Sequence, residues 1–247
     1  MDVVYTLWLR EMLKFLRNKG RVVGTMGMPL FFLLFIGTGL SSAFALPGGG
    51  SYIQFMAPGI IGMILLFGSV FSGLSVVVDK QFGFMKEILV APIPRLSIVI
   101  GKTLGGATTA ILQALLILFA VVVFGVISFD PVAILLAIPM MMLVSIGFVN
   151  IGILFASRLD DPHAFQIVMN FFIMPLFFLS GAFFPLDNLP GWLKALAFLD
   201  PMTYGVDGLR AILIARSFFP LWVDFAVLAA FAAVTFGLGA WAFDRMK

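Results

Sequence analysis

The chain has 247 residues, of which 62% are hydrophobic and only 11% are charged. Its mean hydropathy is +1.15, so it cannot cover itself with the charged surface that a water-soluble protein needs. The composition therefore excludes a soluble globular protein and predicts one embedded in lipid. Because the chain contains no cysteine, disulfides and thiolate metal sites are excluded as well. We expect no nucleic-acid partner.

Six apolar segments are long enough to cross a bilayer, since a hydrocarbon core of about 30 Å takes about 20 helical residues. A transmembrane β-strand would alternate apolar and polar residues, whereas Ile60–Phe71 and Ile111–Val126 are apolar on nearly every face. The sequence thus predicts an all-α integral membrane protein with a single domain over residues 1–247. The predicted spans are residues 22–46, 55–78, 103–127, 132–157, 164–184 and 221–243.

Lysine and arginine are distributed unevenly over the segments that connect these spans. With both termini in the cytoplasm, the inner segments hold Arg10, Lys14, Arg17, Lys19, Arg21, Lys80, Lys86, Arg95, Lys102, Arg158, Arg245 and Lys247. The outer segments then hold only Lys194, Arg210 and Arg216. The positive-inside rule therefore predicts cytoplasmic N and C termini.

Residues 1–21 form an amphipathic helical pattern ahead of the first span. Its basic face carries Arg10, Lys14, Arg17 and Arg21, and its apolar face carries Val4, Tyr5, Trp8, Met12, Phe15 and Leu16. We expect an interfacial helix that lies flat in the headgroup plane of the inner leaflet. It would serve either as a basic anchor or as an elbow that transmits motion to the first span.

The loop over residues 79–102 carries both signs of charge and two prolines. A short helix is expected over Gly83–Val90, and Pro92 and Pro94 stop it because each proline restricts its own backbone and that of the preceding residue. The result would be a bent, rigid loop rather than a plain connection. An ordinary amphipathic turn between two spans is the alternative.

The outer segment, residues 186–219, contains signals for two short helices. Asp187, Asn188 and Pro190 mark the start of the first, and Asp200 and Pro201 break the chain before the second. Asp207 and Arg210 lie three apart and can pair. A helical pair that re-enters the membrane from outside would form an outer gate, with candidate residues Asp200, Pro201, Tyr204, Asp207 and Arg210. A surface hairpin without a gating role is the alternative.

Polar and small residues inside the spans indicate how the helices associate. Gln113, Asn150 and Asn170 would form interhelical hydrogen bonds or contact substrate. Small residues four apart let helices approach closely, either within one subunit or at a dimer seam. These pairs are Gly101/Gly105, Gly68/Ser72 and Gly152/Ala156.

Two signals for other chemistry are weak. His163 is the only histidine and has too few neighbouring ligands for a metal site, so we expect no metal. Gly101-Lys102-Thr103 lacks both the preceding strand and the earlier glycine of a phosphate-binding loop. The chain is therefore expected to have no ATPase site of its own.

Three motifs resemble one known family. They are Glu87-Ile-Leu-Val-Ala-Pro-Ile-Pro-Arg95 with Gly101-Lys102, Tyr52-Ile-Gln-Phe-Met-Ala-Pro-Gly59, and Phe198-Leu-Asp-Pro-Met-Thr-Tyr-Gly-Val-Asp-Gly-Leu-Arg210. In this order among six spans they resemble the membrane subunit of type-2 ABC exporters, specifically the daunorubicin-resistance type of drug-export permease. Asp200 stands where that family more often has asparagine, and both residues cap helices well.

The resemblance implies a permease of a prokaryotic plasma membrane, acting as a homodimer or as a heterodimer with a similar permease. A separate ATPase subunit would bind ATP and magnesium, while this chain binds no cofactor. The short helix near Gly83–Val90 would be the coupling helix, with the ATPase-contacting residues Phe84, Lys86, Glu87, Leu89, Pro92, Pro94 and Arg95. The cargo would be a hydrophobic or amphipathic drug, lipid or lipid-linked glycan, moved across the plasma membrane, and membrane lipid would be a further partner of the chain.

Two other functions stay open at this point. An ion-coupled secondary transporter usually keeps ionisable residues at membrane depth, and Asp224 alone lies near a span, at its outer end. A membrane enzyme acting on lipid would need an ionisable pair, for which Asp207 and Arg210 are the one visible candidate.

Overall fold

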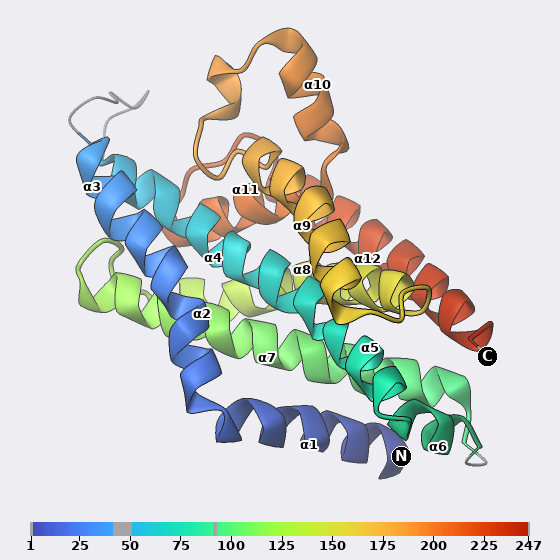
Figure 1. Cartoon of the computed structure of the whole chain (residues 1–247). Coiled ribbons are helices and arrows are strands. Elements are labelled where there is room, and N and C mark those ends of the chain that lie inside the picture. Colours follow the sequence, from blue (N-terminus) through green and yellow to red (C-terminus); the bar gives the residue numbers. More distant parts are fainter. Residues whose placement is uncertain (1, 42–50, 91–92, 247) are drawn as a thin grey trace.

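The computed structural model describes residues 2–41, 51–90 and 93–246, and within these ranges it contains helices and turns but no strand (Figure 1). The all-α prediction is confirmed for this part of the chain. The elements are α1 (Asp2–Arg17), α2 (Lys19–Phe31), a π-helical turn (Phe32–Ile36), α3 (Gly37–Gly39), α4 (Tyr52–Ser72), α5 (Leu74–Gln81), α6 (Phe84–Val90), α7 (Arg95–Val123), α8 (Pro131–Ala156), α9 (Pro162–Leu179), a 3-10 turn (Leu186–Asn188), α10 (Gly191–Leu199), α11 (Pro201–Ile214) and α12 (Leu221–Asp244).

Five helical segments of the described chain are long and apolar enough to cross a membrane. They are Tyr52–Gln81, Arg95–Val123, Pro131–Ala156, Pro162–Leu179 and Leu221–Asp244, and they correspond to the second to sixth predicted spans. The first predicted span, residues 22–46, is partly outside the described residues. Its described part contains the shorter apolar helix Gly24–Gly39, so a sixth span stays a prediction.

The third span begins earlier than its sequence indicates. α7 starts at Arg95, with Pro94 in extended geometry before it, whereas the apolar pattern predicts a start at residue 103. The predicted loop over residues 79–102 is correspondingly shorter, because α5 continues to Gln81 and the start of α7 occupies its last third, from Arg95 to Lys102. The cause is Lys102, whose charge interrupts the apolar run but is neutralised inside the helical packing.

Three helices begin at the same dipeptide, an aspartate followed by proline. The carboxylates of Asp130, Asp161 and Asp200 each accept hydrogen bonds from backbone N–H groups in the first turn of α8, α9 and α11. Aspartate satisfies donors that the helix leaves unpaired, and proline at the next position has no N–H to satisfy. The predicted break at Asp200 is confirmed, and α11 begins directly after it.

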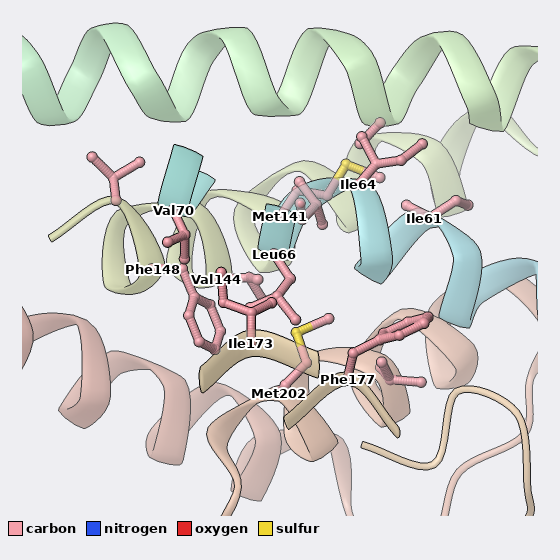
Figure 2. Packing of buried hydrophobic residues seen from close by; sticks show 14 of the residues in the cluster. Ile61, Ile64, Leu66, Val70, Met141, Val144, Phe148, Ile173, Phe177 and Met202 are labelled. Atoms are coloured by element: carbon pink, nitrogen blue, oxygen red, sulfur yellow. The ribbon is translucent and has the colours of Figure 1, made fainter. Parts of the chain in front are cut away.

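The core is built around α4, which packs against α7, α8, α9 and α11. Figure 2 shows residues of four helices in one buried cluster, namely Ile61, Ile64, Leu66 and Val70 of α4, Met141, Val144 and Phe148 of α8, Ile173 and Phe177 of α9, and Met202 of α11. In the spanning window that contains α4, 61% of the residues are buried, against 22% in those of α9 and α12. α4 is therefore the central helix, and α9 and α12 are peripheral.

The small-residue pairs predicted from sequence pack within this one chain. An added Cβ on Gly101 or Gly105 would lie 2.9 Å from Leu7 or Glu11 of α1, and one on Gly152 would collide with the Val70 carbonyl of α4. Close backbone approach of this kind is a main source of helix association in a bilayer, because the hydrophobic effect does not drive helices together in lipid.

Candidate functional site

The short helix predicted near Gly83–Val90 is present as α6, Phe84–Val90, at the end of the molecule that also holds α1 (Figure 1). Gly83 precedes it with a φ of +75°, a left-handed conformation that glycine adopts without strain. Met85 and Ile88 are buried, whereas Glu87 and Val90 are exposed. Glu87 is thus on the outward face of α6. Pro92 and the side chains of Lys86 and Leu89 lie outside the described part of the structure.

A buried ion cluster lies behind α6. Asp79 of α5 accepts hydrogen bonds from Lys102 Nζ at 2.6 Å and from the Arg10 guanidinium at 2.5 and 3.2 Å. The Asp79 and Lys102 side chains are only 5% and 3% exposed. Buried charges persist where partners satisfy them, so this cluster fixes α1, α5 and α7 relative to one another.

Glu11 and Lys14 of α1 complete the cluster. Lys102 Nζ also donates to Glu11 Oε1 and Ser75 Oγ, both at 3.2 Å. Lys14 Nζ is more loosely held, at 3.4 Å from Glu11 and 3.9 Å from Asp79. Partial burial lowers the pKa of Lys14 from its ordinary value, against the opposing attraction of these two carboxylates.

α1 packs along the first half of α7 instead of contacting lipid alone. Leu7 and Met12 are buried, and Trp8 Nε1 donates a hydrogen bond to Thr108 Oγ1 at 3.1 Å. Tyr5, which the helical pattern places on the apolar face, is 59% exposed. The Arg10 guanidinium lies 4.2 Å from the ring centre of Phe84, so α6 is joined to the ion cluster through α1.

Arg95 contacts the last helix of the chain. Its Nη1 donates to the backbone carbonyls of Asp244 and Met246, the latter at 3.1 Å. Pro94 is the residue before α7 and is exposed. The guanidinium of Arg95 is therefore engaged within the chain, and of these two predicted ATPase-contacting residues Pro94 is the more accessible.

The predicted outer-gate residues come together around α10 and α11, at the opposite end of the molecule (Figure 1). Asp200 Oδ1 accepts from the Met202 N–H at 2.9 Å, and Thr203 Oγ1 donates to the Ala197 carbonyl at 2.7 Å. Tyr204 donates to the Phe198 carbonyl at 2.9 Å. The two short helices are thus joined by hydrogen bonds across the break at Asp200 and Pro201.

Asp207 and Arg210 tie this helical pair to the rest of the chain. Asp207 accepts from the backbone N–H groups of Phe218 and Phe219 at 2.8 to 2.9 Å. Arg210 donates to the Gly181 carbonyl at 2.9 Å, and its guanidinium lies 4.0 Å from the Phe55 ring centre. The predicted pair itself is loose, with 4.0 Å between the charged atoms, so each residue serves mainly as a bridge to other segments.

Asp200→Ala is expected to lower the free energy of unfolding by about 1 kcal/mol, because it removes the cap of α11. Asp200→Asn retains the accepting oxygen and should stay close to the wild type. Thermal unfolding of the purified chain in detergent micelles compares the two variants. Equal losses would show that the charge of Asp200, and not its capping bond, stabilises this end.

The three predicted polar residues of the spans have different surroundings. Asn150 is fully buried, accepts from Thr103 at 3.2 Å and donates to the Ile146 carbonyl at 2.8 Å, which supports interhelical bonding. Gln113 is buried and lines a cavity. Asn170 is exposed on α9.

Among the described residues no group of three or more metal-ligating side chains gathers, and His163 is exposed.

The cavity has a volume of about 780 Å³, within the range of small-molecule sites. It is lined by residues of α1, α2, α4, α5, α7 and α9, and α4 supplies six of them. Its lining includes Glu11, Lys14 and Lys102 of the ion cluster.

The ion cluster itself was not predicted from the sequence. The available signal was Lys102 itself, a charge inside an apolar helical pattern, which requires a buried partner.

Comparison with known proteins gives consistent matches. The profile of the ABC-2 type transporter family matches residues 2–214. The inner membrane transport permease YadH of Escherichia coli K12 is 31% identical over 243 residues, which cover 96% of this chain and 92% of YadH. Nodulation protein J of Rhizobium meliloti is 25% identical over 88% of this chain and 83% of its own. The transport permease ycf38 of Cyanophora paradoxa is 32% identical over 65% of this chain, a match that spans only 56% of ycf38.

Proposed function

The chain belongs to the ABC-2 type transporter family, and from this premise we propose that it is the permease subunit of an ATP-driven exporter. Two copies of the chain, or one copy and a similar permease, would form the pathway. Separate ATPase subunits would bind ATP and magnesium and move the coupling helices when they close. The cargo would be a hydrophobic or amphipathic drug, lipid or lipid-linked glycan.

The position of α6 carries this proposal. Its outward face presents Glu87, and its first residue, Phe84, contacts Arg10 of the buried ion cluster. A force applied to α6 would therefore reach α1, α5 and α7 together, through a cluster whose members are held at short distances. A loop that served only as a connection would gain nothing from such a link.

The proposed setting is a prokaryotic plasma membrane, with six spans and both termini in the cytoplasm. The basic residues at the α1 and α6 end support this orientation. In it α10 and α11 lie on the outer side, where they would re-enter the membrane and gate the exit. Assembly with a second permease copy would complete the pathway, since a closed two-fold dimer is the commonest symmetric assembly.

A test of the proposal is purification of the tagged chain from native membranes together with its soluble partners. We expect an ATP-hydrolysing subunit to copurify. Glu87→Lys should reduce its recovery about ten-fold, the effect of one charge-assisted contact replaced by repulsion. Asp244→Lys is the matched control, because Asp244 is an exposed carboxylate at the same end of the molecule. Recovery that Glu87→Lys leaves unchanged would contradict a coupling role for α6.

One observation favours a second candidate, an ion-coupled transporter. The carboxylate of Asp224 is fully buried, and neither oxygen has a hydrogen-bond partner in the described chain. Buried carboxylates of membrane proteins commonly bind a proton or an ion. Cargo movement by the purified chain in liposomes, driven by an ion gradient without any ATPase, would establish this function and exclude the first. Asp224→Asn should then abolish that movement.

A further inference from the structure

The cavity over α4 has a polar end and an apolar body. At the polar end lie Glu11 and Lys14 of α1, Ser75 of α5 and Lys102 of α7. The body is lined largely by aromatic and methionine side chains, namely Met28, Phe32, Met63, Phe67, Met174, Phe177 and Phe178, with Thr109 and Gln113 of α7 as polar exceptions. A ligand that matches both parts is itself amphipathic, because an apolar group at the charged end, or a charged group against the aromatic side chains, would lose its solvation without compensation.

The charge balance at the polar end selects the sign of the ligand's headgroup. Arg10, Lys14 and Lys102 face Glu11 and Asp79, so the ion cluster carries one positive charge in excess. Asp79 is occupied by Lys102 and Arg10 at hydrogen-bond distance, whereas Lys14 has the longest contacts of the cluster and a side chain that is 44% exposed. Lys14 is thus the cation with capacity for a further anionic partner.

We propose that this cavity binds an amphiphile with an anionic headgroup and a single apolar body, with the headgroup held by Lys14. The volume of about 780 Å³ accommodates a ligand of drug size. The proposal rests on the transport function above, since it names the chemical class of the cargo. The same chemistry could come from a membrane phospholipid, and the experiment separates these two sources.

The test uses two probes of equal chain length, each with a photoreactive diazirine on the chain. One is dodecyl phosphate and the other is dodecyltrimethylammonium. The purified chain in phosphatidylcholine nanodiscs is irradiated with each probe, and the labelled residues are identified by mass spectrometry. We expect the phosphate to label the cavity lining about ten times more than the ammonium, as one charge-assisted contact implies. Equal labelling by both probes would overturn the proposal.

Two pairs of variants locate the headgroup and the apolar body. Lys14→Gln should lower phosphate labelling about ten-fold, whereas Lys14→Arg should retain it. Arg17→Gln is the matched control, because Arg17 is an exposed cation of the same helix outside the cavity lining. An equal loss in Arg17→Gln and Lys14→Gln would mean that the general charge of α1, and not a site, attracts the probe.

Gly24 and Gly27 of α2 provide the second pair. An added Cβ at either position meets no atom within 4 Å, but only Gly24 lines the cavity. Gly24→Phe should therefore fill the site without disturbing the fold and abolish labelling of the lining. Gly27→Phe should leave labelling unchanged. Persistent labelling in Gly24→Phe would show that the probe binds elsewhere.

Lipid extraction of the purified chain identifies the source of the ligand. An anionic phospholipid retained by wild type and by Gly27→Phe, but lost from Gly24→Phe, would identify the occupant as a membrane lipid. Absence of such a lipid together with specific labelling would identify it as cargo. Both outcomes support an anionic amphiphile. The assay contains neither ATPase nor nucleotide, so its result is independent of the copurification test of α6.

Discussion

Asp79→Asn is expected to lower the free energy of unfolding by about 3–5 kcal/mol, the cost of removing one partner from a buried ion pair. The substitution leaves Lys102 almost fully buried, with Glu11 as its remaining carboxylate at 3.2 Å. It also replaces the charged acceptor of Arg10 by a single neutral amide oxygen, which weakens the hold on α1. Denaturant titration of the purified chain in mixed micelles measures the loss.

A second aspartate–lysine pair of the chain is the control. Lys80 Nζ lies 3.0 Å from Asp160, whose side chain is 87% exposed. Because solvent screens an exposed pair, Asp160→Asn should change the free energy of unfolding by less than about 1 kcal/mol. The double variant Asp79→Leu with Lys102→Met should recover much of the stability lost in Asp79→Asn, since it removes both charges. Equal effects of Asp79→Asn and Asp160→Asn would refute the assignment of the buried cluster.

Gly152→Val is expected to destabilise the fold by about 1–3 kcal/mol or more, the range for added volume in a packed core. Gly152 of α8 faces the backbone of Val70 in α4 and of Gly73 directly after α4, and a Cβ there would collide with the Val70 carbonyl oxygen. Backbone cannot move aside as the end of a flexible side chain can. Thermal unfolding in micelles and the yield of folded protein both report the effect.

Gly237→Val tests whether this cost comes from packing. Gly237 of α12 has no atom within 4 Å of an added Cβ, so the substitution should be tolerated. A loss of stability as large as that of Gly152→Val would mean that valine itself, and not the contact between α4 and α8, weakens these helices.

Much of this fold could be predicted from the sequence, because lipid imposes strong and simple patterns. Length and hydropathy place the second to sixth spans. The prediction of a short helix before Pro92 gives α6, and the Asp200-Pro201 pair gives the boundary of α11. Each of these follows from a local rule that one segment obeys by itself.

The sequence did not indicate which side chains of different helices contact one another. The sequence pattern assigns Lys102 to the end of a charged loop, whereas in the structure Lys102 forms a buried ion pair with Asp79. Arg95 reads as an exposed loop cation, whereas it binds the carbonyls at the end of α12. Asn150 gives no sign in sequence of its contact with Thr103. In an apolar helix every face looks alike, so periodicity cannot select the buried one.

The attachment of Arg95 to the end of α12 has a mechanical consequence. α12 has 24 residues, which makes it a rod about 36 Å long at 1.5 Å per residue. Its far end contacts α11, where Cβ of Asp224 would lie 3.3 Å from a Cβ added to Gly208. A displacement of Arg95 at the start of α7 would therefore be transmitted along the rigid α12 to the opposite end of the molecule, without bending of any other helix.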